Sequence, residues 1–398
     1  MPWSEILPMD ERLRFIADHQ NKLFSMTELC ARYGVSRKTG YKWVRRYEMD
    51  GPAGLYELPR KPHSCPHQTP PELVEQVLGL RKRHPDFGSK KLLQLLRERK
   101  PKLRWPARST IDDILKRHGL VPKRRRTRRP GHPGRPVTPM TSPNEIWTVD
   151  FKGEFRTRDG IYCYPLTVED GYSRYLLACR GLYGTRHRET KQVLRQLFRQ
   201  YGLPEIIRSD NGAPFASTAL GRLSRLSVWW VRLGIYPELI EPGHPEQNGR
   251  HERMHRTLKE RATRPPGSTL RGQQRKFNDF LRYYNEDRPH ESLGQRRPAS
   301  VYQPSNRQYP EKLEPLEYPG HYEVRLVSRN GGLRWNGVRV PVSHVLEGEY
   351  VGLEEIDDGV WEVYFGPLRL GRLNERDMRI EDVLGRKRRR RLLPMSPD

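Results

Sequence analysis

Three acidic residues, Asp150, Asp210 and Glu252, have types and spacing that suit the binding of divalent metal ions. Asp150 lies in the run EIWTVDFKG, Asp210 ends the apolar part of EIIRSDNGAPF, and Glu252 begins the basic run HERMHRTLKE. Carboxylate oxygens suit Mg²⁺ or Mn²⁺, and a pair of such ions stabilises the entering and leaving oxygens of an in-line displacement at phosphorus. The three acids are therefore candidate ligands for two divalent ions, with water or a DNA hydroxyl as nucleophile.

Two glutamates compete for the third position. Glu246 lies in a turn 36 positions after Asp210, whereas Glu252 lies 42 positions after it, past Gly249. The segment from Gly249 onward reads as a helix because Pro245 and Gly249 interrupt only its start. We prefer Glu252, which lies on that helix, and Glu246 stays the alternative.

The helix expected around Glu252 also carries cations. His255, Arg256 and Lys259 follow Glu252 by three, four and seven positions, a spacing that puts all four side chains on one helical face. A metal-bound carboxylate would then lie beside groups that reach a phosphate. We expect Arg256 and Lys259 to bind DNA.

Short strands and helices are expected to position these acids. In EIWTVDFKG, Trp147, Val149 and Phe151 alternate with Asp150, which predicts a strand. The runs YCYPLTVED and RYLLACRGL predict two neighbouring strands joined by a turn at residues 170–173, and a helix is expected from about Glu189 to Gln200. A further short strand ends at Asp210.

The N-terminal segment has helix-turn-helix spacing. A helix from Thr27 ends at Gly34, and Ser36 is suited to cap a second helix. The start of a recognition helix meets base edges and phosphates. The residues expected to do so are Arg37, Lys38, Tyr41 and Lys42. The alternative is a helical hairpin with a solvated basic face.

A second helical segment follows a Pro-rich connector. Its apolar residues fit a helical period from Glu72, Ser109 is an expected helix cap, and Gly119 is an expected helix end. The pattern again resembles a helix-turn-helix, which would extend the DNA site that is read. A purely structural support for the first unit is the alternative.

Basic runs and the overall charge point to a polyanionic partner. The chain of 398 residues has a formal net charge of +26 and a pI near 10.1, which creates a potential that attracts phosphate backbones. A linker between the helical and catalytic segments contains no acid, and its candidate DNA contacts include Arg124, Arg125 and Arg126. Charge alone would also suit RNA or an anionic membrane, so the order of the motifs decides for double-stranded DNA.

The C-terminal region alternates apolar and polar residues and is punctuated by NGG, NG and DDG. This pattern predicts about five short strands, which we interpret as a small β-barrel. Its arginines would contact DNA or a neighbouring subunit, or the domain would only stabilise the protein. These arginines are Arg325, Arg329, Arg334 and Arg339.

Other ligand chemistries and other compartments are disfavoured. The four cysteines form no C-x-x-C pair, and the cluster His63, Cys65 and His67 has no second ligand pair, so no zinc site is expected. No apolar run reaches about 18 residues, and the N-terminus lacks the layout of a signal peptide. A cytoplasmic protein, associated with the nucleoid when bound to DNA, is expected.

The motifs around the three acids resemble a known family. In order and context, WTVDFKG, SDNGAPF and HPEQNGRHERMHRTLK are similar to the integrase-type core of bacterial insertion-sequence (DDE) transposases and of retroviral integrases. VEDGYSRYLLA and NDFLRYYNEDRPHESLGQRRPASVY extend the resemblance, which with the helical units covers about residues 20 to 305. The zinc-binding module of the retroviral proteins is absent from the sequence.

This resemblance implies a fold and an activity. The core would be an RNase H-like α/β domain with a mixed five-stranded sheet, between all-α helix-turn-helix units and the C-terminal barrel. Asp150, Asp210 and Glu252 would hold two Mg²⁺ or Mn²⁺ ions, and Lys259 would contact a DNA end. Such proteins bind the terminal inverted repeats of a mobile element, cleave 3′ ends and transfer strands, as homo-oligomers that hold both element ends.

The spacing between the second and third acids departs from the family pattern. Since 42 positions exceed the typical spacing, a small insertion is implied near residues 223–233, and Glu246 would fit the usual spacing better. Two other functions stay open: a DNA-binding regulator with an inactive core, and an RNase H-type nuclease. The expected domains are 1–60, 70–121, the linker 122–140, the core 141–305, the barrel 318–380 and a basic tail 381–398.

Overall fold

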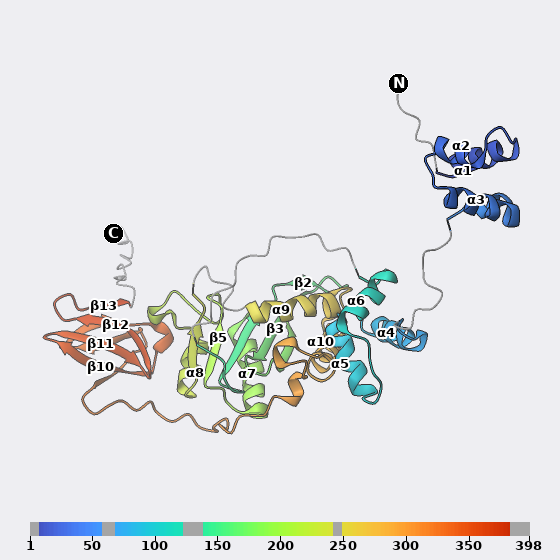
Figure 1. Cartoon of the computed structure of the whole chain (residues 1–398). Coiled ribbons are helices and arrows are strands. Elements are labelled where there is room, and N and C mark those ends of the chain that lie inside the picture. The colour runs from blue at the N-terminus through green and yellow to red at the C-terminus, as the bar shows by residue number, and fades with distance from the viewer. Residues whose placement is uncertain (1–7, 58–67, 122–137, 242–248, 383–398) are drawn as a thin grey trace. The chain divides into compact units, whose positions relative to one another are not determined.

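The computed structural model describes residues 8–57, 68–121, 138–241 and 249–382 (Figure 1). Several residues discussed above lie outside these ranges: the linker residues Arg124, Arg125 and Arg126, the alternative acid Glu246, the cluster at 63–67 and all but the first two residues of the basic tail. The chain divides into two compact units, an N-terminal unit, Met1–Pro70, and a C-terminal unit, Pro71–Asp398.

The N-terminal unit is a three-helix bundle. It contains α1 (Pro8–Gln20), α2 (Met26–Arg32), α3 (Arg37–Asp50) and the short 3₁₀ helix η1 (Gly51–Leu55). Ser36 caps α3 by accepting a hydrogen bond from the backbone N–H of Thr39, and Ser25 with Glu28 forms a capping box for α2. The predicted helix-turn-helix is confirmed, and α1, which the sequence analysis did not identify, completes its core through Phe15 and Ile16.

Three helices at the start of the C-terminal unit form what we call the helical module: α4 (Pro71–Arg83), α5 (Ser89–Arg99) and α6 (Arg108–Arg117). Gly119 ends α6 with a positive φ of 68°, as predicted. The predicted cap at Ser109 is wrong, because α6 begins at Arg108 and its N-cap residue is Ala107, which has no side-chain hydrogen bond.

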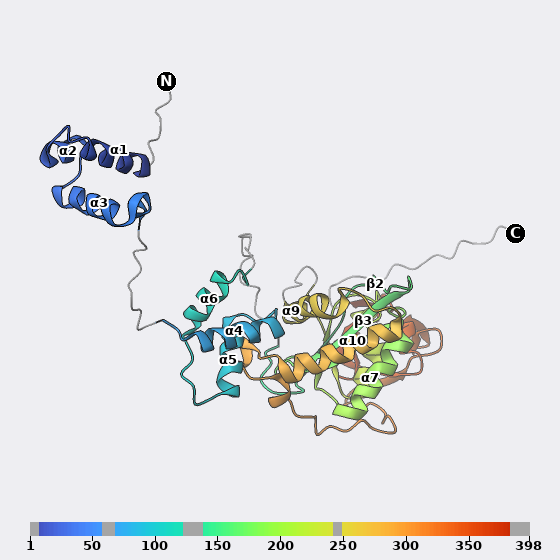
Figure 2. The same cartoon turned by 90° about the vertical axis from the view of Figure 1, so that its right-hand side faces the viewer.

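The helical module shares a hydrophobic core with the domain that follows it. Leu80, Phe87 and Ile111 of the module belong to the same buried cluster as Phe277 and Tyr283. In Figure 2 the module lies beside α9 (Gly249–Leu258) and one end of α10 (Leu270–Arg282). This packing makes the module part of the C-terminal unit.

The central sheet is mixed, as the RNase H-like prediction requires. Its strands lie in the order β4 (Leu176–Leu182), β3 (Tyr162–Asp170), β1 (Ile146–Phe151), β5 (Ile206–Ser209) and β6 (Tyr236–Leu239). β4, β3 and β1 pair antiparallel, whereas β1, β5 and β6 pair parallel. A sixth strand of two residues, β2 (Phe155–Arg156), pairs with the start of β3, so the predicted count of five is one too few.

Helices cover both faces of the sheet. Trp147 and Val149 of β1 join a buried cluster with α7 (His187–Tyr201) and α8 (Arg225–Arg232) on one face. On the opposite face, α9 and α10 pack over β3 and β4 through Met254, Leu258 and Phe277. Because side chains alternate along a strand, Thr148 and Asp150 point toward the face that α9 covers.

The segment expected to contain an insertion, residues 223–233, is instead a core element. It forms α8, which makes the crossover between the parallel strands β5 and β6, and its Leu226 and Trp230 are fully buried. An insertion at this place, as the spacing implies, would therefore be part of the core and not an appended loop.

The C-terminal sheet is not the closed barrel that the sequence suggested. Its strands follow the order β13 (Arg379–Asp382), β12 (Leu368–Asn374), β11 (Val360–Phe365), β10 (Tyr350–Asp357) and β7 (Glu323–Leu326). A separate hairpin of β8 (Gly332–Trp335) and β9 (Val338–Pro341) lies beside both edge strands. Among the described residues no ladder joins the hairpin to those edges, so the barrel is not closed.

Cys30, Cys163 and Cys179 are buried free thiols. In the described parts of the chain, no helix combines the length and apolar character needed to cross a membrane.

Candidate metal centre and DNA-binding surfaces

Asp150 and Asp210 lie next to each other at the carboxyl ends of two parallel strands. Val149 of β1 is in register with Ser209 of β5, so the acids that follow occupy matching places one residue further on. Neighbouring strands lie about 4.8 Å apart, which brings the two carboxylates to one edge of the sheet. The parallel pairing thus joins two acids that are far apart in the sequence.

The pKa of Asp150 is raised by burial and by its acidic neighbours. Burial raises the pKa of Asp150 to about 7, and the negative charge of Asp210 is the next cause. Glu252 also raises the pKa of Asp150, whereas the backbone N–H of Phe151 and the charge of Lys152 lower it. All three predicted acids therefore act on one site.

Asp210 carries an unsatisfied buried oxygen. Burial raises its pKa, and a hydrogen bond from the backbone N–H of Gly212 opposes the shift. Its Oδ1 is buried and has no hydrogen-bond partner among the described residues. Gly212 allows this close approach, since a Cβ there would lie 3.0 Å from Asp210 Oδ2. A buried acceptor without a donor fits a place where a cation binds.

Glu252 lies in the first turn of α9 and is exposed, with Arg256 and Lys259 also exposed further along the chain. The predicted fourth member of this face is wrong. His255 is only 5% exposed and faces the sheet, because it shares the buried side of α9 with His251, Met254 and Leu258.

Two histidines attach α9 to the sheet. The Nε2 atoms of His251 and His255 each lie 2.7 Å from the hydroxyl of Thr167 on β3. His251 Nδ1 lies 2.8 Å from the hydroxyl of Thr148, and His255 Nδ1 lies 3.8 Å from Asp150 Oδ2. Burial lowers the pKa of both imidazoles, that of His251 to about 3, so both are neutral.

The same histidines and Asp150 are close enough to be considered as a metal-binding group, since their ligand atoms lie within 4.8 Å of one another. However, the Thr167 hydroxyl already contacts both Nε2 atoms at hydrogen-bond distance. We interpret the histidines as anchors of α9. The sequence analysis missed this role.

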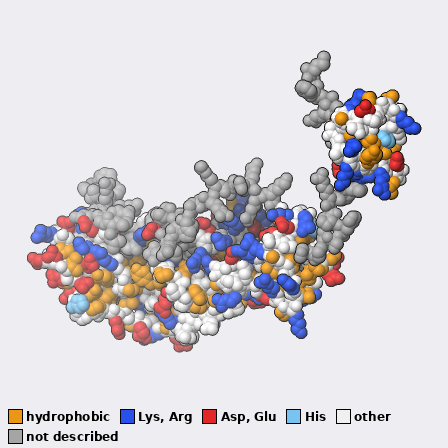
Figure 3. Space-filling view, viewed as in Figure 1, with side chains coloured by type: hydrophobic (Ala, Val, Ile, Leu, Met, Phe, Trp, Pro, Cys, Tyr) orange, Lys and Arg blue, Asp and Glu red, His pale blue; other side chains and the backbone are white. Residues whose placement is uncertain are grey.

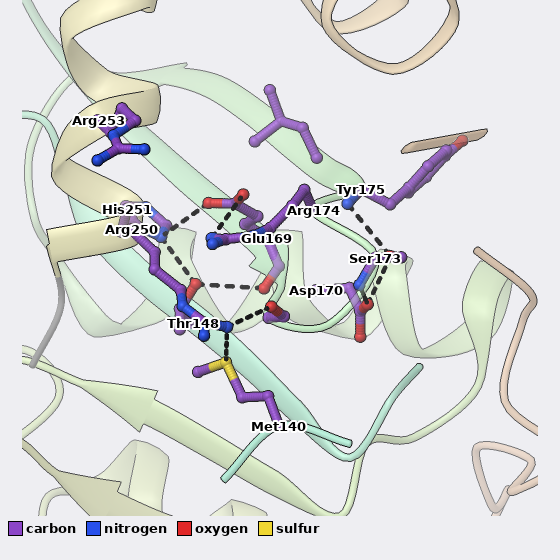
Figure 4. Close-up of polar contacts among 12 residues, drawn as sticks. Met140, Thr148, Glu169, Asp170, Ser173, Arg174, Tyr175, Arg250, His251 and Arg253 are labelled. Carbon is purple, nitrogen blue, oxygen red and sulfur yellow. Dashed lines mark hydrogen bonds and ion pairs between the residues drawn. The ribbon is translucent and has the colours of Figure 1, made fainter. Parts of the chain in front are cut away.

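A buried acid lies beneath the start of α9. Glu169 of β3 is 1% exposed, and burial raises its pKa to about 7, partly offset by Arg174 at 3.8 Å. Figure 4 shows Glu169 with Arg174 and His251, and Arg250 of α9 extending toward Met140. Arg250 Nη1 also donates to the carbonyl oxygen of Gly171 at 3.2 Å. These contacts fasten the first turn of α9.

The acids fit a hard divalent cation better than a softer ion that prefers nitrogen or sulfur ligands. Asp150 and Asp210 offer clustered carboxylate oxygens with one unsatisfied buried atom, and Glu252 is close enough to affect the pKa of Asp150. Hard oxygen donors of this kind suit Mg²⁺ or Mn²⁺. These three residues would hold the ions.

In the N-terminal unit, the predicted recognition residues lie on the surface of α3. Arg37, Lys38, Tyr41 and Lys42 are all exposed, Tyr41 by 58%. The Lys42 ammonium lies 4.6 Å from the centre of the Trp43 ring, so part of this face is already packed. Figure 3 shows basic side chains over both units, with acidic ones interspersed among the C-terminal strands.

The C-terminal arginines are partly engaged within the domain. Arg325 pairs with Glu323 at 2.7 Å, and Arg329 lies 3.7 Å from Glu347. Arg339 donates to the backbone carbonyl of Asn330. Their predicted contact with DNA or a second subunit remains a prediction.

Five domain models match this chain. Two described as integrase core domain match residues 140–245 and 233–298, and one described as the C-terminal domain of IS481 family transposases matches residues 322–382. A helix-turn-helix domain model matches residues 11–63, and a homeodomain-like model matches residues 39–115. The chain therefore combines an integrase-type core with helix-turn-helix domains.

Two individual proteins are also similar to this chain. The uncharacterized 39.2 kDa protein of insertion element IS476 from Xanthomonas euvesicatoria is 29% identical over 255 residues, 63% of this chain and 70% of that protein. The Gag-Pol polyprotein of baboon endogenous virus is 34% identical over 122 residues, 31% of this chain but only 7% of the polyprotein. These matches confirm the resemblance to bacterial insertion-sequence DDE transposases with an integrase-like core.

Among solved structures, the HTLV-2 integrase catalytic core domain in complex with magnesium is similar at 16% identity. The match covers 41% of this chain and 98% of that one, with a TM-score of 0.32.

Proposed function

We propose that this chain is an active transposase that binds the terminal inverted repeats of a mobile element, cleaves their 3′ ends and joins them to target DNA. The main support is the parallel register of β1 and β5, which brings Asp150 and Asp210 to the carboxyl ends of neighbouring strands. The pKa of Asp150 agrees with this arrangement, since it is raised to about 7 by burial first, then by Asp210, and also by Glu252. A regulator with an inactive core would not need three acids in one electrostatic cluster.

In this proposal, the acidic residues of the site bind metal ions and the basic residues bind DNA. Asp150 and Asp210 would hold divalent ions from the sheet edge, and Glu252 from the first turn of α9. Two bound ions would stabilise the entering and leaving oxygens of the phosphodiester. Arg256, exposed on α9, and Lys259, exposed at the start of the π-helix η4 (Lys259–Thr263) that continues it, would bind phosphates of the DNA end.

The remaining surfaces would recognise the element ends. The exposed start of α3 would read double-stranded DNA in the major groove through Arg37, Lys38 and Tyr41. Because a mobile element has two ends, joining both requires at least two active sites, and we propose a homo-oligomer in a synaptic complex.

A joining assay tests the central claim. Oligonucleotides carrying the repeats that flank the coding region are incubated with the protein and Mg²⁺, and binding, cleavage and joining are measured separately. Asp150→Asn should bind DNA normally and lose both cleavage and joining. Substantial joining by this variant would overturn the assignment.

The third ligand needs a paired comparison. Glu252→Gln should lose cleavage, and Glu246→Gln, the matched control, should keep it. The reverse result would transfer the role to Glu246. Lys259→Ala should lower the salt dependence of end binding by about one phosphate contact.

The same assay distinguishes the other functions. Cleaved but unjoined ends from the unaltered protein would indicate a nuclease, and binding without cleavage would indicate a regulator.

A further inference from the structure

One hydroxyl group lies between the two elements that carry the candidate metal ligands. Thr167 is fully buried on β3, directly opposite Asp150 of β1 in the antiparallel register. Its Oγ1 lies 3.1 Å from the backbone carbonyl oxygen of Asp150 and 2.7 Å from Nε2 of both His251 and His255 on α9. The hydroxyl thus contacts the strand of one acid and the helix of another.

The number of hydrogens decides how these contacts are made. A hydroxyl has one hydrogen to donate and two lone pairs to accept with. The carbonyl oxygen of Asp150 can only accept, so it takes that hydrogen. Both imidazoles must then donate from Nε2–H to the two lone pairs of Thr167. This arrangement satisfies all three contacts and uses the full capacity of the hydroxyl.

The tautomers of both histidines follow from this arrangement. Each neutral ring carries its hydrogen on Nε2 and has an unprotonated Nδ1. The hydroxyl of Thr148 has one hydrogen and two acceptors in reach. It donates to His251 Nδ1 at 2.8 Å rather than to the carbonyl oxygen of Glu169 at 3.2 Å, which attaches α9 to β1 as well. Since His251 and His255 are one helical turn apart, the two bonds to Thr167 fix both the position and the rotation of α9.

We propose that Thr167 is a positioning residue, which holds the helix carrying Glu252 at a fixed place over the strand carrying Asp150. The inference rests on the proposed function in that these acids bind metal together. Mg²⁺ requires near-ideal octahedral geometry, so a small displacement of one ligand weakens binding. Residues that orient ligands in this way commonly change metal affinity by about 10- to 100-fold when replaced.

The experiment compares matched variants of the full chain. Thr167→Val keeps the shape and removes the hydroxyl, Thr167→Ser restores the hydroxyl, and Thr157→Val removes a different buried hydroxyl, one that bonds within its own turn. Metal affinity is measured without DNA by titration with Mn²⁺ and detection of the free ion by electron paramagnetic resonance. Melting temperatures are recorded in parallel.

We expect Thr167→Val to weaken Mn²⁺ binding by about ten-fold or more. Thr167→Ser should bind within about three-fold of the unaltered protein, and Thr157→Val should lose stability without losing metal affinity. A folded Thr167→Val protein with unaltered Mn²⁺ affinity would overturn the proposal.

A second measurement does not depend on the variants folding. The ¹⁵N chemical shifts of the imidazoles in the unaltered protein should identify His251 and His255 as Nε2–H tautomers. A hydrogen on Nδ1 of either neutral ring would refute the hydrogen-bond arrangement. If Asp150→Asn binds Mn²⁺ like the unaltered protein, the proposed metal site fails, while the tautomers still test the linkage through Thr167.

Discussion

Metal binding at the candidate site should strengthen about ten-fold between about pH 6 and about pH 8, because a metal ion competes with the proton on Asp150. The pKa of Asp150 is raised to about 7, by burial first and by Asp210 second. With that pKa, the ionised fraction rises from about a tenth to about nine-tenths across this range. A carboxyl group at its ordinary pKa would be ionised throughout and would give no such change.

Without metal, the same shift acts on folding in the opposite direction. The pKa of Asp150 is higher in the folded chain than the ordinary value of 3.8, so the folded state binds more protons. The stability that this group contributes is complete below about pH 4 and is lost as the pH rises through about 7. Bound metal removes this loss, so its stabilising effect should be larger at the higher pH.

Thermal melts of the full chain with and without MgCl₂ measure this effect. The rise in melting temperature on adding Mg²⁺ should be small at about pH 6 and clear at about pH 8. Asp150→Asn should abolish the rise at both values, and Asp113→Asn, on the exposed face of α6, should change neither. An equal rise at both pH values, or a rise that survives Asp150→Asn, would refute the reasoning.

Three further predictions concern other parts of the chain. Asp86→Asn breaks a part-buried contact of the helical module with Tyr283 and Arg288, which follow α10, and should cost about 2 kcal/mol in chemical denaturation. Asp113→Asn, which removes an exposed ion pair, should cost under about 0.5 kcal/mol. Gly40→Ala would put a Cβ 2.6 Å from a buried sulfur and should lower the stability of the N-terminal unit by about 1 to 3 kcal/mol, whereas Gly79→Ala meets open space and should not destabilise its helix. Lys38→Ala should reduce the salt dependence of DNA binding by about one unit, as measured by gel shifts at several salt concentrations. The first expectation would be contradicted if Asp86→Asn lowered the free energy of unfolding no more than Asp113→Asn. The second would be contradicted if Gly40→Ala left the thermal stability of the N-terminal unit unchanged. The third would be contradicted if Lys38→Ala left the salt dependence of DNA binding unchanged.

The strands and the first two acids could be predicted because their signals are local. Alternation around Asp150 and the apolar run before Asp210 correctly identified β1 and β5. Their parallel pairing involves residues far apart in the chain, and only the resemblance to a family implied it. The prediction of a closed barrel was wrong for the same reason, since alternation of apolar and polar residues identifies strands but does not show which edge strands pair.

The buried side of α9 was the main error of the sequence analysis. Spacing alone put His255 on the face of Glu252, although Met254 and Leu258 mark the neighbouring face as the one that packs. The imidazole of His255 was assumed to face solvent because it is polar. Its partner Thr167 comes from a strand that is distant in sequence, and no local pattern would have indicated the pair.

The common core of the helical module and the catalytic domain constrains how elements of this type can diversify. Replacing residues 71–121 alone would remove one side of this shared core, in which the ring of Phe87 stacks on that of Tyr283. The break between compact units instead falls at Pro70. We therefore expect exchange of the N-terminal unit at Pro70 to be tolerated better than exchange of the helical module, which shares its core with the domain that follows.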